Sequence, residues 1–127
     1  MSRAFAKVLA FALLCLLPAL AGAQMPAALQ PPPPFLGRDL AALCNEAEGS
    51  PARAGCLRYL QAAVAMYELL QAEGRDNAWF CAPRDVPPAN LRQQFLDFTA
   101  EAAPDELGKE AIQLVRQAFT DAFPCQE

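Results

Sequence analysis

Four of the five cysteines constrain the fold of this chain more than any other feature, and the fifth, Cys15, lies in a predicted signal peptide. The four are Cys44, Cys56, Cys81 and Cys125, scattered through the sequence without a C-x-x-C pair, and the chain contains no histidine. A zinc site is therefore poorly supported, whereas an even number of cysteines in an exported chain is typical of disulfides. We predict two disulfides and no metal or other cofactor.

Export is predicted from the start of the chain. Two basic residues, Arg3 and Lys7, precede an apolar run that ends in the Ala-Gly-Ala of residues 21–23. This pattern is typical of a cleaved secretory signal peptide and is too short for a membrane anchor. A lipid-modified Cys15 is rejected because Leu14 stands where lipoprotein signals need a small residue. Cys15 therefore leaves with the signal.

The remaining chain is acidic. Eight basic residues face 14 acidic ones after cleavage, which gives a net charge of about −6. Such a surface repels phosphate, so we expect no nucleic-acid partner. No second long apolar run follows, so we expect no membrane contact after signal cleavage. The predicted organisation is a signal peptide over 1–23, a proline-rich, polyproline II leader over 24–35 and one helical domain over 36–127.

The hydrophobic pattern predicts an all-α fold. Apolar residues recur at helical spacing in four segments, and no segment alternates as a strand would. The predicted helices span about 36–47, about 56–73 with a left-handed cap at Gly74, a third from Pro88 or Ala89 to about 102, and a fourth from Pro104 to just before Pro124. The connection over 75–88 is long for a small domain. The simplest arrangement is a small antiparallel four-helix bundle stapled by two disulfides.

That topology selects the cysteine pairs. In alternating helices, Cys44 and Cys56 lie at one end of the bundle, and Cys81 and Cys125 at the other. The helices are about 18–27 Å long, whereas a disulfide needs Cα atoms within about 7 Å. We therefore predict the pairs 44–56 and 81–125, which makes the end of the chain part of the fold.

Catalytic signals are thin. Without histidine the commonest general base is absent, and the cysteines are committed to disulfides. Neighbouring carboxylates such as Asp105 and Glu106 point apart on a helix and suit its positive end. The sequence therefore predicts a binding protein rather than an enzyme.

Three stretches carry a family resemblance: "LCNEAEGSPARAGCLRYLQAAV" (43–64), "FCAPRDVPPANLRQQFLDF" (80–98) and "AIQLVRQAFTDAFPC" (111–125). A Cys-x-x-Tyr-Leu opening, a Phe-Cys-x-Pro element and a closing Phe-Pro-Cys in this order resemble the Rap/Tai family of immunity proteins, linked to bacterial type VI secretion. The resemblance covers about 40–125. Ala82 departs from it, since a larger apolar residue is common there, and so does the missing glycine before Tyr59.

The resemblance implies a periplasmic, all-helical and often dimeric protein that inhibits an injected protein toxin. Such toxins are typically amidases that cut the peptide crosslinks of the cell wall. The alternative from composition is a periplasmic stress chaperone or envelope assembly factor. Two disulfides and a locked C-terminus favour a rigid recognition surface instead.

The segment 72–80 ("AEGRDNAWF") is the predicted partner-binding region. It holds Arg75 and Trp79, which belong to the residue types most enriched at interface hot spots. A bridge at the neighbouring Cys81 would preorganise the segment. The alternative is that Trp79 or Phe80 simply caps the end of the bundle.

Overall fold

The computed structural model describes residues 32–75 and 79–125 of the 127-residue chain. The chain divides into two units, Met1–Pro32 and Pro33–Glu127, and all the helices described here belong to the second. The predicted signal peptide and most of the leader lie outside the described residues.

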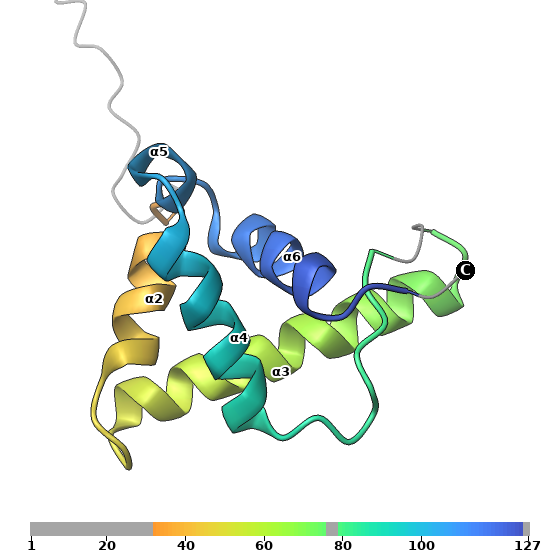
Figure 1. Ribbon diagram of the computed structural model, residues 1–127, viewed down its shortest axis with the longest axis horizontal. Helices are drawn as coiled ribbons and strands as arrows, with labels where there is room; N and C mark the ends of the chain where they lie inside the picture. Colours follow the sequence, from red (N-terminus) through yellow and green to blue (C-terminus); the bar gives the residue numbers. More distant parts are fainter. Residues whose placement is uncertain (1–31, 76–78, 126–127) are drawn as a thin grey trace, which may run out of the picture. The chain divides into compact units, whose positions relative to one another are not determined.

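The described part of the chain is helical and contains no β-strand, in agreement with the predicted all-α class. Its helices are α2 (Gly37–Asn45), α3 (Pro51–Ala72), α4 (Pro88–Glu101), α5 (Pro104–Leu107) and α6 (Ala111–Ala122) (Figure 1). The prediction of an antiparallel four-helix bundle holds only in part, because these residues form five helices.

The fourth predicted helix is divided into α5 and α6. After α5 the backbone of Glu110 is extended, and it forms an isolated antiparallel bridge with Leu36. The Gly37 amide donates to the Lys109 carbonyl at 2.8 Å, and the Ala111 amide donates to the Phe35 carbonyl at 2.9 Å. These tertiary hydrogen bonds satisfy backbone groups that a continuous helix would have paired locally.

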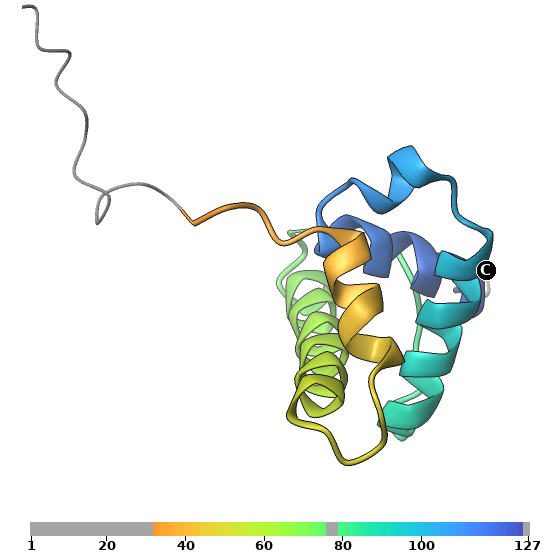
Figure 2. The ribbon, with the colours of Figure 1, turned by 90° about the vertical axis from the view of Figure 1, so that its left-hand side faces the viewer.

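The helices surround one core without running side by side throughout. Helices α2 and α3 run in clearly different directions in Figure 1 and meet at the turn that joins them, and Figure 2 shows α2 between α3 and α4. Helix α2 also packs on α6, and α4 packs on both α3 and α6. The fully or almost fully buried side chains are Leu40, Cys44, Cys56, Leu60, Ala63, Tyr67, Phe80, Leu91, Phe95, Ala111, Leu114, Val115, Ala118 and Phe119.

Helix α3 begins five residues before the predicted start at Cys56. Ser50 caps it, because its hydroxyl accepts a hydrogen bond from the Arg53 amide at 3.1 Å, and Pro51 occupies the first turn, where its missing N–H is not needed. Cys56 therefore lies inside the helix rather than at its first residue.

The predicted cap at Gly74 is confirmed. Gly74 has φ 64°, its amide donates to the Gln71 carbonyl, and the Arg75 amide donates to the Leu70 carbonyl, each at 3.0 Å. This pair of hydrogen bonds is the Schellman motif that ends helices with a left-handed residue. The chain thus leaves α3 in a fixed direction.

Two disulfides are present, and they join the pairs derived from the order of the cysteines. Cys44 and Cys56 have Cα atoms 5.1 Å apart, and Cys81 and Cys125 have Cα atoms 4.9 Å apart. The first pair is fully buried, whereas Cys81 is exposed and Cys125 half-buried. The two bridges therefore lie in different surroundings.

Candidate functional site

The second disulfide fixes the segment around Trp79 to the end of the chain. Next to that bridge, the Cys81 amide donates to the Phe123 carbonyl at 2.8 Å. The Gln71 side chain of α3 donates to the Phe80 carbonyl at 3.3 Å. The segment is therefore held from two sides, by α3 and by the residues after α6.

Phe80 belongs to the core. Only 2% of it is exposed, and its ring packs edge-on against Tyr67 of α3 and Phe119 of α6, with centroid distances of 5.3 and 5.6 Å. Edge-to-face pairs of this kind add to the stabilisation from burial. The alternative that an aromatic residue here caps the core is thus correct for Phe80.

Trp79 lies on the surface. Its side chain is 38% exposed, and the guanidinium carbon of Arg116 lies 4.4 Å from the centroid of the indole ring. This cation–π contact holds the indole against α6 while leaving one side accessible. Trp79 has the exposure that a partner-binding residue needs, and its role in binding stays a prediction.

Arg75 forms an ion pair with Glu73 rather than a contact with Trp79. Its guanidinium lies 3.6 Å from the Glu73 carboxylate, and both side chains are largely exposed. In the part of the chain that the structure describes, no contact joins Arg75 to Trp79, and 76–78 between them lie outside that part. The structure therefore does not bring the two predicted residues together.

A hollow of about 370 Å³ opens beside Trp79. Residues of α4, α5 and α6 line its other sides: Phe98, Glu106, Arg116, Gln117, Thr120 and Asp121. The side-chain oxygen of Gln117 is buried there without a hydrogen-bond partner. The sequence interpretation did not assign these residues to a binding surface. The four-residue spacing of Arg116 and Thr120 predicts that they share a helix face, but it does not indicate that Trp79 lies beside that face.

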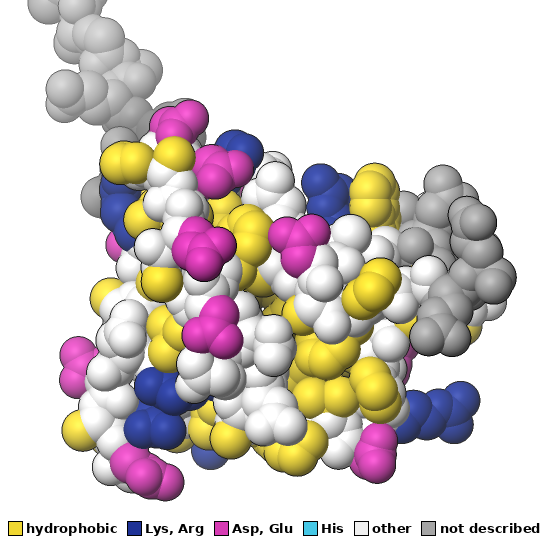
Figure 3. Space-filling view, viewed as in Figure 1, with side chains coloured by type: hydrophobic (Ala, Val, Ile, Leu, Met, Phe, Trp, Pro, Cys, Tyr) yellow, Lys and Arg dark blue, Asp and Glu magenta, His cyan; other side chains and the backbone are white. Residues whose placement is uncertain are grey.

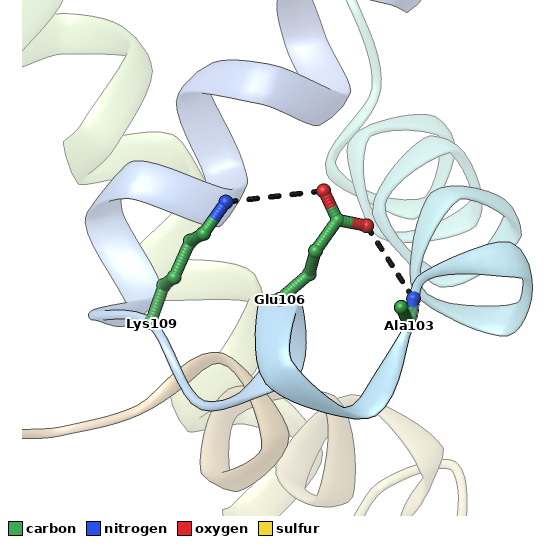
Figure 4. Close-up of polar contacts among 3 residues, drawn as sticks. All are labelled: Ala103, Glu106 and Lys109. Carbon is green, nitrogen blue, oxygen red and sulfur yellow. Dashed lines mark hydrogen bonds and ion pairs between the residues drawn. The ribbon is translucent and has the colours of Figure 1, made fainter.

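Among the lining residues, Glu106 has a carboxylate that is already engaged in contacts within the chain. One carboxylate oxygen accepts a hydrogen bond from the Ala103 amide at 3.4 Å, and the other lies 3.8 Å from the Lys109 ammonium (Figure 4). Glu106 thus neutralises the positive end of α5 and is partly neutralised by Lys109.

A second concave region lies between α3 and the 80–86 segment. Two hollows of about 310 and 600 Å³ lie there between α3 and the segment, and both are lined by Glu68, Ala82 and Arg84. The small side chain of Ala82 fills little of this space. Ala82 is half-buried and packs against the edge of the core, so the departure from the family pattern lies where the core meets this concave surface.

Among 32–75 and 79–125, no polar or charged residue is buried as a whole, although the Gln117 side-chain oxygen is, and no group of histidine, cysteine or carboxylate side chains could hold a metal ion. None of the described helices is both long and apolar enough to cross a membrane. Burial, with smaller effects from Tyr67 and Glu110, raises the pKa of the Tyr59 hydroxyl above its usual value. Tyr59 packs beside Phe35 and does not line the hollow beside Trp79.

Comparison with known protein families identifies a family for this chain. The model of the family described as Rap1a immunity proteins matches 36–125, which is most of the chain. The match begins at the residue that bridges to Glu110 and ends at the cysteine that closes the second disulfide. The resemblance drawn from the three sequence stretches is confirmed. No protein with curated annotation matches the chain.

Proposed function

Because the chain belongs to the Rap1a immunity protein family, we propose that it binds a secreted protein toxin and blocks its activity. The observation that carries this proposal is the family match over 36–125, which spans both disulfides and the surface around Trp79. An inhibitor of this kind needs a rigid surface rather than reacting groups. The exposed indole, fixed by Arg116 and by the nearby bridge, supplies such a surface.

The proposed toxin is an amidase of the cell wall, delivered by type VI secretion, and the proposed site of inhibition is the periplasm. The apolar run and cleavage site before Gln24 support export, and the two disulfides suit an oxidising compartment. The acidic surface disfavours nucleic acid as a partner, whereas inhibition by contact requires only a protein partner. The proposed inhibitor acts without catalysing a reaction.

Protection of living cells tests this function. Cells that express a candidate amidase effector, directed to their periplasm, are given either the full-length chain or a form without residues 2–23. The full-length chain is expected to restore survival, and the leaderless form is not, because it is confined to the cytoplasm. Equal protection by both forms would contradict periplasmic inhibition.

A binding control separates inhibition from general rescue. The purified domain is expected to form a defined complex with the effector and to stop its cleavage of cell-wall peptide crosslinks. If the domain instead leaves the effector active and prevents acid-induced aggregation of unrelated envelope proteins, the chaperone alternative is correct.

A further inference from the structure

An acidic groove between α4 and α6 adjoins the Trp79 surface. It has a volume of about 250 Å³. Its lining residues are Gln94, Asp97, Phe98, Glu101, Ala118, Asp121 and Ala122. The α4 residues follow the i, i+3, i+4, i+7 spacing of one helix face, and the α6 residues follow the same rule. Figure 3 shows acidic side chains over both helices with hydrophobic ones between them.

The groove combines an apolar floor with a negative rim. Phe98 and the two alanines supply the apolar surface, and Asp97, Glu101 and Asp121 supply three carboxylates. None of its lining residues is basic. Arg116, which lines the adjoining hollow, is stacked on Trp79.

The rim carboxylates have no ion-pair partner in 32–75 and 79–125. The ion pairs found there join Arg75 to Glu73 and Lys109 to Glu106. Asp97 accepts one hydrogen bond from Gln93, which lies on its own helix and carries no charge. These three carboxylates are exposed and therefore accessible to a basic group of a partner.

We propose that this groove receives a lysine or arginine side chain from the surface of the toxin. This inference rests on the proposed function and specifies the chemistry of the partner. Long basic side chains pack their aliphatic stems on apolar surface while their charged heads reach outward, which fits a floor of Phe98 and alanine below three carboxylates. The volume suits one such side chain and lies below the roughly 300–1,000 Å³ of small-molecule pockets.

The groove is continuous with the Trp79 surface. Phe98 and Asp121 line both the groove and the hollow beside Trp79. A partner that covers the indole would therefore reach the carboxylates at the same time. The net negative charge of the domain would also speed the approach of a basic partner surface.

The test compares two triple variants that remove the same charge. One, Asp97→Asn with Glu101→Gln and Asp121→Asn, neutralises the rim. The control, Glu46→Gln with Glu48→Gln and Asp85→Asn, neutralises three exposed carboxylates elsewhere. Kd and association rate are measured with the effector against which the chain protects cells, at 50 and 300 mM salt.

We expect the rim variant to weaken binding by about tenfold at low salt, mainly through slower association, and to bind with a flatter salt dependence. The control variant should change Kd by less than about twofold. Equal losses in the two variants, or no loss in the rim variant, would overturn the proposal while leaving the proposed function intact.

A small probe covers the case in which the effector does not bind the wild-type chain, which would reject the proposed function. Argininamide, with citrulline amide as the uncharged control, is titrated to 50 mM and followed by amide NMR. We expect argininamide, but not citrulline amide, to change the amide chemical shifts of Ala118 and Ala122. The rim variant should not show these changes. Absence of these shifts, or equal shifts with citrulline amide, would overturn the proposal.

Discussion

The two disulfides close very different regions of the molecule. Cys44–Cys56 spans 12 residues, joins consecutive helices and is fully buried, and beside it Arg92 of α4 donates to the Cys44 carbonyl at 2.6 Å. Cys81–Cys125 spans 44 residues and ties an exposed connection to the end of the chain. The first bridge is therefore part of the core, whereas the second holds a surface in place.

The largest effect is expected from removing the buried bridge. Replacing both residues, Cys44→Ala and Cys56→Ala, should lower the free energy of unfolding by about 4–5 kcal/mol. The loop-closure contribution is roughly 3 kcal/mol, and the remainder comes from the cavity left where two fully buried sulfurs were. Urea unfolding measured by circular dichroism checks the value. A loss below about 2 kcal/mol would mean that the core does not depend on this bridge.

A smaller loss is expected from removing the exposed bridge. Cys81→Ser with Cys125→Ser should cost about 2–3 kcal/mol, although loop closure alone predicts roughly 4 kcal/mol for the longer loop. The difference arises because the freed ends can fray locally in the folded state, and this fraying offsets part of the entropy gained by the unfolded chain. Hydrogen exchange should show faster exchange at the Cys81 amide with protection retained in α2 and α3. Uniform loss of protection would contradict the distinction between the two regions.

Adjacent aromatic residues sharpen the comparison inside the second region. Trp79→Ala should weaken effector binding by about 1–2 kcal/mol and change the free energy of unfolding by less than about 1 kcal/mol, since the indole is 38% exposed and held by one cation–π contact. Phe80→Leu is the control, because it alters a buried ring and should reduce stability more than Trp79→Ala does. Differential scanning calorimetry measures the change in stability, and isothermal titration calorimetry measures the change in affinity for the effector. A large stability loss with unchanged affinity would assign Trp79 to the core.

The smallest effects are expected at two matched glycines, one beside each region. Gly49 has φ 79° in the turn closed by the buried bridge, and Gly74 has φ 64° where the second connection begins. A Cβ at either position would meet no atom within 4 Å, so alanine adds backbone strain alone, about 1 kcal/mol at each. Gly49→Ala should show its cost in global unfolding, and Gly74→Ala mainly in faster exchange of the Arg75 amide. A local effect of Gly49→Ala together with a global effect of Gly74→Ala would contradict the distinction between the buried and the exposed region.

The sequence predicted what local pattern and chain order determine. Helical periodicity placed the helices and Gly74 marked the end of α3. The order of the cysteines selected 44–56 and 81–125 once the helices were taken to alternate in direction. The earlier start of α3 was also local, since Ser50 followed by Pro51 is a helix-start signal, but the glycines nearby masked it.

Tertiary contacts decided what the sequence did not predict. The separation of α5 from α6 depends on backbone hydrogen bonds between 35–37 and 109–111, which hydrophobic spacing does not record. The contact of Trp79 with Arg116, and the groove lined by Asp97 and Asp121, likewise depend on which helix faces meet. Candidate binding residues could therefore be chosen by type, whereas their neighbours required the fold.

Selective opening of the exposed disulfide tests most directly whether it holds the binding surface. Brief treatment with dithiothreitol should reduce Cys81–Cys125 before the buried Cys44–Cys56, and alkylation followed by mass spectrometry identifies the opened pair. The affinity of this product for the effector is then compared with that of the untreated chain. We predict at least a tenfold loss of affinity with an unchanged helical circular dichroism signal. Equal affinity for the effector before and after opening would contradict the account.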